Sequence, residues 1–273
     1  MLKDITLGQY FPGTSPLHKL DPRMKIILTV IYIVDILFAS NIWSFLLVSL
    51  FTVGLVLIST IPPKIVIKGL NPLIFIIAFT VIFNIFWTEG DHLLLSAGPV
   101  KIYLEGIMYA IFMIVRVVAL LAGTCVVLTY TTSPIALTDG LEQLLSPLKK
   151  LRLPVHEFSM MMTIALRFIP TLVEETDKIM SAQKARGADF ESGSLISRAK
   201  ALVPILIPLF VSAFRRADDL AVAMECRCYR GGEGRSKMTA LHFTGRDFLW
   251  LGIFLLFGAA VILINRFAPG ISL

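Results

Sequence analysis

Five long runs of apolar residues constrain this chain more than any other feature of its sequence. The runs are Met24–Ala39, Ile42–Ile61, Leu70–Trp87, Gly106–Tyr130 and Phe248–Phe267. A helix that crosses the hydrocarbon core of a bilayer needs roughly 20 mostly apolar residues. Of the 273 residues, 56% are hydrophobic and 16% are charged, against about a quarter charged in a typical soluble domain. The sequence therefore predicts an all-α integral membrane protein with five transmembrane helices.

The basic residues indicate which ends of these helices face the cytoplasm. They gather before the first run, between the second and third, after the fourth and before the fifth: His18, Lys19, Arg23, Lys25, Lys64, Lys68, Lys149, Lys150, Arg152, Arg235, Lys237 and Arg246. The connection after the third run instead carries Glu89, Asp91 and Glu105 against a single Lys101. Cytoplasmic loops retain positive charge. The N-terminus is therefore expected inside and the C-terminus outside.

This topology divides the chain into five parts. We expect a cytoplasmic N-terminal segment at residues 1–23, four transmembrane helices within 24–130, and a cytoplasmic domain at 131–247. A fifth transmembrane helix follows at 248–267, and an extracellular tail at 268–273 ends the chain. Nothing in the sequence alternates aromatic and basic residues along a groove-sized stretch, so nucleic-acid binding is not expected.

The cytoplasmic domain contains two apolar runs, Phe158–Ile169 and Ala201–Phe214, which are too short to span a bilayer. Charged residues interrupt the apolar pattern at helical spacing. The pattern predicts two long amphipathic helices that lie on or just beneath the bilayer and pack through their apolar faces. Asp177 and Asp218 each stand nine residues before an arginine, which indicates a weak internal repeat.

Those two arginines stand in the short motifs Ala185-Arg186-Gly187 and Cys226-Arg227-Cys228, and they are 41 positions apart. Glycine is favoured just past a helix end because it tolerates positive φ. Arginine there interacts favourably with the helix dipole, and its planar fork can donate several hydrogen bonds to a partner. Two interpretations stay open: the arginines cap solvated helices, or they form contacts with another protein.

Other polar groups offer weaker candidates for a site. Asp35 and Arg116 lie inside predicted spans and form a possible intramembrane pair that packs two helices. Cys226 and Cys228 have no histidine nearby in sequence, so we expect no metal site. The stretch at 231–237 is rich in glycine, but no Gly-Lys pair occurs anywhere in the chain, so a phosphate loop is excluded. No catalytic residue and no cofactor site are expected, and ATP would have to be bound by a partner.

The stretch before the first span carries a recognisable signature. Gly8-Gln9-Tyr10, Pro12-Gly13-Thr14-Ser15 and Leu20-Asp21-Pro22-Arg23-Met24-Lys25 follow one another in order. This stretch resembles the opening of the transmembrane coupling subunit of energy-coupling factor transporters, the EcfT family, which is related to CbiQ. That family also carries two Ala-Arg-Gly motifs at the ends of its coupling helices. The first is intact here, whereas the second keeps its arginine between two cysteines.

The resemblance implies a function without catalysis of its own. Two ABC-type ATPase subunits (EcfA-like) would bind beneath the chain. Ala185, Arg186 and Gly187 would contact one, and Cys226, Arg227 and Cys228 the other. The different motifs fit two non-identical ATPases without requiring them. A separate membrane protein, the S component, would bind a vitamin or another micronutrient, and the complex would lie in a prokaryotic cell membrane.

Two other functions remain as alternatives. A self-sufficient transporter should show two related halves with helices broken at mid-membrane, and the five runs show no such symmetry. A membrane enzyme such as a phosphatidyl-alcohol transferase should carry clustered aspartates at the membrane face. Asp139-Gly140 is followed by Leu141-Glu142, which does not complete such a cluster.

Overall fold

The computed structural model describes residues 10–88, 92–97, 100–151, 154–190, 194–231 and 241–267. It divides into two units. The membrane unit comprises residues 9–143 and 241–273, and the α7–α8 unit comprises residues 1–8 and 144–240. The predicted tail at 268–273 and most of the glycine-rich stretch at 231–237 lie outside the described residues.

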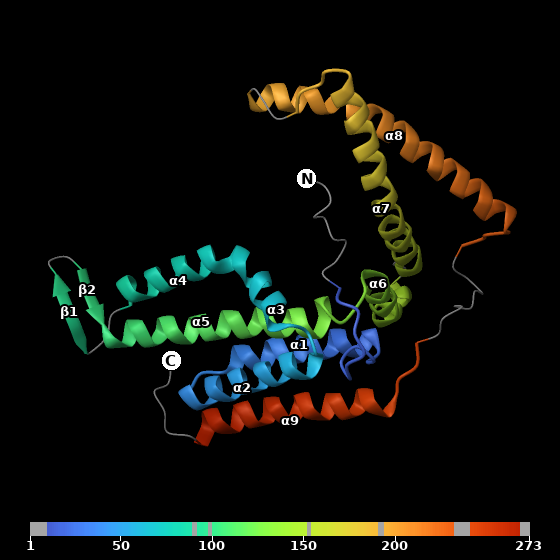
Figure 1. The fold of residues 1–273 in the computed structure, drawn as a ribbon. Helices are drawn as coiled ribbons and strands as arrows, with labels where there is room; N and C mark the ends of the chain where they lie inside the picture. The colour runs from blue at the N-terminus through green and yellow to red at the C-terminus, as the bar shows by residue number, and fades with distance from the viewer. Residues whose placement is uncertain are drawn as a thin grey trace. The chain divides into compact units, whose positions relative to one another are not determined.

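In the membrane unit, α1 (Pro22–Phe38) and α2 (Ile42–Ser59) form a middle layer. On one side α9 (Gly245–Phe267) packs against this layer, and on the other side lies α5 (Leu104–Thr124), as Figure 1 shows. Tyr32 of α1 is fully buried where these helices meet. Its hydroxyl lies 2.7 Å from the hydroxyl of Thr52 in α2 and donates to the carbonyl of Ala119 in α5 at 2.9 Å. One side chain thus joins three helices.

The start of α1 is fixed by the signature residues. Asp21 is the N-cap, and its Oδ1 accepts a hydrogen bond from the backbone N–H of Arg23 at 2.9 Å. Pro22 occupies the first helical position, where a missing N–H costs nothing. In the preceding loop, both ring nitrogens of His18 are bonded, to Ser15 Oγ at 2.7 Å and to the Phe11 carbonyl at 2.9 Å. The histidine is therefore a structural residue.

The two ends of α1 are tied to the two ends of α9. At the N-terminal ends, the backbone N–H of Asp21 donates to Asp247 Oδ1 at 3.0 Å. At the C-terminal ends, Asn265 Nδ2 donates to the carbonyl of Phe38, and Asn265 Oδ1 accepts from the N–H of Ser40. The two helices are therefore parallel and run side by side over the full length of α1.

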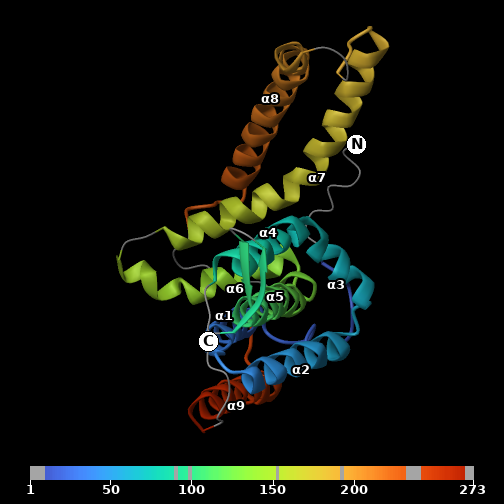
Figure 2. The ribbon, with the colours of Figure 1, turned by 90° about the vertical axis from the view of Figure 1, so that its left-hand side faces the viewer.

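The helices between α2 and α5 in the chain lie at the edge of this unit. After α3 (Pro63–Leu70) and a 3-10 turn (Asn71–Leu73), α4 (Ile74–Trp87) packs on α5 alone among the long helices. Figure 2 shows the resulting order of layers, with α4 above α5 and α9 at the opposite side. α5 then continues through a π-helical turn (Cys125–Thr129) into α6 (Pro134–Leu144).

The all-α prediction is confirmed, with one short β-hairpin as an addition that the sequence did not predict. Between α4 and α5, β1 (Leu93–Ala97) and β2 (Val100–Tyr103) form an antiparallel hairpin, with Leu95 opposite Ile102 and Ala97 opposite Val100. The two runs are too short to cross a bilayer, and pairing with each other satisfies their backbone groups. The rest of the described secondary structure is helical.

Within the described ranges, four helical stretches are long and apolar enough to span a membrane: Ile42–Ser59, Pro63–Trp87, Leu104–Thr129 and Gly245–Phe267. They correspond to the second, third, fourth and fifth predicted spans. The first predicted span is α1, which has 17 residues.

The α7–α8 unit consists of a 3-10 segment (Ser146–Leu151) and two long helices, α7 (Val155–Ala185) and α8 (Leu195–Cys226), which Figures 1 and 2 show. The two predicted long helices are confirmed. Their predicted packing through the apolar faces is only partly formed, because many apolar side chains of α8 stay exposed: Leu202, Val203, Leu206, Ile207, Phe210, Val211 and Phe214.

Gly258 of α9 packs against Asp35 of α1. We predict that Gly258→Ala destabilises the chain by about 1–3 kcal/mol, because an added methyl group would overlap the carboxylate of Asp35. Gly252→Ala in the same helix is the control, since an added Cβ there meets nothing within 4 Å. Thermal unfolding in detergent measures the difference. Equal melting temperatures for the two variants would contradict this packing.

Candidate functional site: two matched helix ends

The two arginine motifs end α7 and α8 with the same hydrogen-bond pattern. In the first, the N–H of Gly187 donates to the Lys184 carbonyl at 3.0 Å, and that of Ala188 donates to the Gln183 carbonyl at 3.0 Å. Gly187 has a φ of 88°. These bonds and the left-handed residue define a Schellman motif, with Arg186 as the C-cap.

In the second motif, each of these features recurs 41 residues later. The N–H of Cys228 donates to the Glu225 carbonyl at 2.8 Å, and that of Tyr229 donates to the Met224 carbonyl at 3.0 Å. Cys228 takes the left-handed position with a φ of 56°. Arg227 therefore occupies the position that Arg186 holds in α7. The weak repeat seen in the sequence is a structural repeat at the helix ends.

The repeat extends along both helices. α7 has 31 residues and α8 has 32, so an offset of 41 aligns them from start to end. The contact between them includes an ion pair of Glu175 in α7 with Arg216 in α8. These two residues are themselves 41 positions apart, each 11 residues before the arginine of its motif. The helices therefore meet at equivalent positions, and each arginine lies about 16 Å along its helix from that contact.

Both arginines are exposed, as are Ala185, Gly187, Cys226 and Cys228. Within the residues that the structure describes, neither guanidinium has a hydrogen bond or an ion pair. An exposed guanidinium with small neighbours at a rigid helix end can make a bidentate contact with a carboxylate or a carbonyl of a partner.

The predicted intramembrane pair is not formed. Arg116 donates through Nη2 to the carbonyl of Ala39 at 2.7 Å and lies 5.2 Å from the ring centroid of Phe45. Asp35, 9% exposed, faces Gly258 of α9, and its Oδ2 has no hydrogen-bond partner. Arg116 therefore caps the end of α1, whereas Asp35 packs between α1 and α9. The sequence placed both residues in the membrane but could not give the rotation of each helix.

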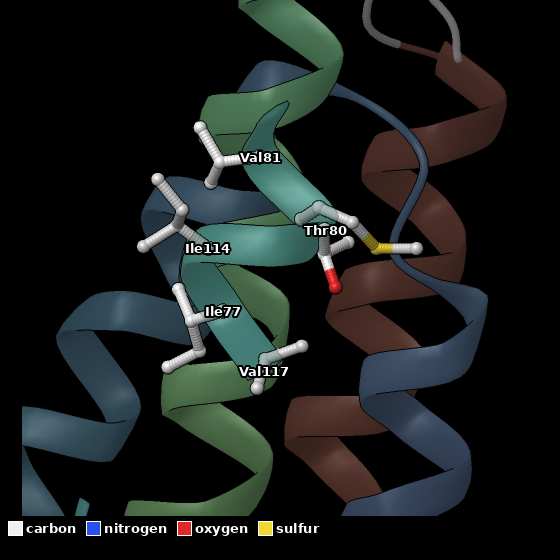
Figure 3. Close-up of a pocket in the computed structure, with 6 residues that line it drawn as sticks. Ile77, Thr80, Val81, Ile114 and Val117 are labelled. Carbon is white, nitrogen blue, oxygen red and sulfur yellow. The ribbon is translucent and has the colours of Figure 1, made fainter. Parts of the chain in front are cut away.

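A small hollow lies between α4 and α5, and Figure 3 shows its walls. Its lining is Ile77, Thr80, Val81, Met113, Ile114 and Val117. The hydroxyl of Thr80 already donates to the carbonyl of Ile76 at 2.9 Å. This lining gives no support to a binding site for a polar solute. Among the described residues, no group of three or more His, Cys, Asp or Glu side chains could hold a metal ion.

Comparisons with known proteins agree with this arrangement. The CbiQ family, described as "Cobalt transport protein", matches residues 13–239. A protein of Ruminiclostridium cellulolyticum named "Energy-coupling factor transporter transmembrane protein EcfT" is 56% identical over 265 residues, which cover 97% of this chain and 98% of that protein. A protein of the same name from Bacillus subtilis is 51% identical and covers 90% of this chain and 93% of its own length.

The chain belongs to the EcfT family. The family resemblance in the N-terminal signature is thereby confirmed, and the chain is a membrane protein of the energy-coupling factor transporter class. The matched region spans both units, so family membership applies to the two arginine-bearing helices as well as to the membrane unit.

The left-handed residues generate a prediction for this EcfT family member. A side chain at positive φ costs about 1 kcal/mol relative to glycine, so Cys228→Gly should stabilise the end of α8, and Gly187→Val should loosen the end of α7. Hydrogen exchange of the amides at 187–188 and 228–229 measures each effect. Faster exchange at 228–229 in Cys228→Gly would contradict the assigned geometry.

A second prediction concerns the ion pair between Glu175 and Arg216. Glu175→Arg and Arg216→Glu should each lower the stability of the α7–α8 contact, because each places like charges side by side, and the double swap should restore it. Both side chains are partly exposed, so a double-mutant cycle should give a coupling of about 0.2–1 kcal/mol. Additive effects of the two changes would show that the pair contributes nothing.

Proposed function

We propose that this chain is the energy-coupling membrane subunit of an ATP-driven importer. The observation that carries the proposal is the pair of matched helix ends, each with an exposed arginine at the same position of the same motif. Two equivalent ends suit two similar partners. In this proposal, Arg186 with Ala185 and Gly187 binds one ABC-type ATPase, and Arg227 with Cys226 and Cys228 binds the other.

The contacts of α1 support a fifth span. Lys25, at the start of α1, donates from Nζ to the carbonyl of Thr131 at 2.8 Å, just after α5. The two residues therefore lie at the same side of the bilayer, and the chain must cross an even number of times between them. α2, α3–α4 and α5 supply three crossings, so α1 supplies the fourth.

The same geometry supports the proposed orientation. Asp21 bonds Asp247, so the starts of α1 and α9 lie on one side together with Thr131. The basic residues around 18–25 and Arg246 lie on this side, which favours a cytoplasmic location under the positive-inside rule. The segment 131–247 is then cytoplasmic, and α9 leads out of the cell.

The exposed apolar residues of α8 support a membrane partner. Leu206, Phe210 and Phe214 are spaced four residues apart and lie on one stripe with Val203 and Ile207, all of them exposed. An apolar stripe of this extent on a charged helix needs cover from lipid or from another membrane protein. We assign it to the substrate-binding S component, which would supply the specificity for a vitamin or another micronutrient. ATP would be bound by the ATPase subunits alone.

The arginines provide the test. We predict that Arg186→Ala or Arg227→Ala weakens binding of one ATPase by roughly 30-fold, because a central interface arginine can contribute about 2 kcal/mol. The measurement is the amount of each ATPase that co-purifies with the chain from membranes. Arg167→Ala in α7 and Arg215→Ala in α8 are controls, since both side chains are exposed on the same helices.

Two outcomes would overturn the proposal. The first is normal ATPase recovery in the double variant Arg186→Ala, Arg227→Ala with normal membrane insertion. The second is solute accumulation by the purified chain alone in vesicles, which would favour a self-sufficient transporter.

A further inference from the structure

The starts of α1 and α9 are held by a buried polar cluster, which we call the N-terminal clasp: Asp21, Arg23, Lys25, Thr131 and Asp247. Asp247 is fully buried, and Lys25 is 2% exposed. Asp247 Oδ1 accepts from the Asp21 N–H, while its Oδ2 accepts from the N–H and hydroxyl of Thr244 at 2.7 and 2.8 Å. One carboxylate therefore caps α9 and bonds α1.

The basic members complete the clasp. Arg23 donates from Nε and Nη2 to the two oxygens of Asp21 at 3.1 and 2.8 Å, and its guanidinium lies 4.0 Å from the ring centroid of Phe243. Lys25 donates to the carbonyls of His18 at 3.3 Å and Thr131 at 2.8 Å. A buried ammonium is costly unless it is bonded in this way. Lys25 therefore fixes the backbone at the exit of α5.

The clasp lies close to the points where the chain enters and leaves the membrane unit. The chain passes between the two units at residues 8–9, 143–144 and 240–241. All three passages lead into the clasp on the membrane-unit side. The first enters through the loop in which the Phe11 N–H donates to the Tyr130 carbonyl at 2.9 Å. The second leaves after Thr131 through α6, and the third returns through Phe243 and Thr244 into α9.

The second passage is held by packing as well. Gly140 of α6 lies so close to the start of α1 that an added Cβ would sit 3.0 Å from the Cβ of Pro22 and 3.2 Å from the N of Arg23. α6 therefore packs directly against the start of α1, where the clasp lies. A displacement carried along the second or the third passage reaches a residue that contacts the start of α1, Gly140 or Asp247.

We propose that Lys25 is a positioning residue that makes the N-terminal clasp a stiff anchor, through which motion of α7 and α8 reaches α1 and α9. This inference rests on the proposed coupling function. The clasp joins the exit and the return of the cytoplasmic segment to the same helix start, so a movement that arrives at either point acts on α1.

The test uses the complete complex with its ATPases in lipid nanodiscs, with ATP as the only added ligand. Hydrogen exchange is compared with and without ATP. In the wild type, ATP should change exchange at the ends of α7 and α8 and also at residues 10–21 and 241–250. In Lys25→Met, the response at the helix ends and ATP hydrolysis should persist, while the response at 10–21 and 241–250 is lost. Lys25→Arg, which keeps a donor, should restore part of it.

Asn265→Ala is the matched control, because it removes the bonds between α1 and α9 at their opposite ends. It should leave the ATP response unchanged at every site. If Lys25→Met does not assemble, Phe243→Leu removes the ring beneath Arg23 from an exposed position and should reduce the response at 241–250.

The outcomes separate the two proposals. The anchor alone is overturned if the wild type shows an ATP response at the helix ends and Lys25→Met keeps the wild-type response at 10–21 and 241–250. If Lys25→Met does not assemble, the same result in Phe243→Leu overturns the anchor. A wild-type chain that binds no ATPase and shows no ATP response anywhere overturns the coupling function, and the anchor with it.

Discussion

The buried bond between the starts of α1 and α9 is the interaction on which the membrane unit depends. Asp21 and Asp247 are 226 positions apart, yet their bond places α1 and α9 side by side and in parallel. Burying two carboxylates and two cations is unfavourable unless nearly every donor and acceptor is satisfied. Here Arg23 and Lys25 supply the donors, and the backbone supplies the rest. The polar cluster thus specifies one arrangement of helices in an otherwise apolar unit.

A second constraint shapes the α7–α8 unit. A helix C-terminus leaves carbonyls unpaired, and the Schellman motif satisfies them by turning one residue left-handed. Using this motif twice fixes Arg186 and Arg227 at the same place relative to their helix axes. The Glu175–Arg216 pair then joins the helices at equivalent positions. Two partners of similar shape can therefore meet two similar ends, even though one end carries cysteines where the other carries alanine and glycine.

The sequence predicted the elements better than their contacts. The apolar runs located the membrane helices because length and hydropathy are local properties. The motif at 185–187 predicted a helix end because glycine tolerates positive φ, and Cys228 shows the same geometry with a costlier residue. The hairpin at 93–103 was missed, since two short apolar strands resemble the ends of neighbouring spans.

The contacts between distant residues could not be read from the chain. The expected pair of Asp35 with Arg116 failed because hydropathy does not give the rotation of a helix about its axis. Asp247 was not identified from the sequence, because no neighbouring residue indicates that it bonds Asp21. The available signal was chemical: Thr244 followed three residues later by Asp247 is a helix-capping pattern, and the charges of the signature needed buried partners.

The proposed coupling function requires that α7 and α8 move when ATP binds to the partner ATPases. Lys178 and Asp219 are exposed and occupy equivalent positions of the two helices. Spin labels at these two positions allow this motion to be measured by pulsed electron paramagnetic resonance in the assembled complex. The distance between the labels should change on addition of ATP and return to its starting value after hydrolysis. An identical distance distribution with and without ATP, in a complex that imports its substrate, would contradict it.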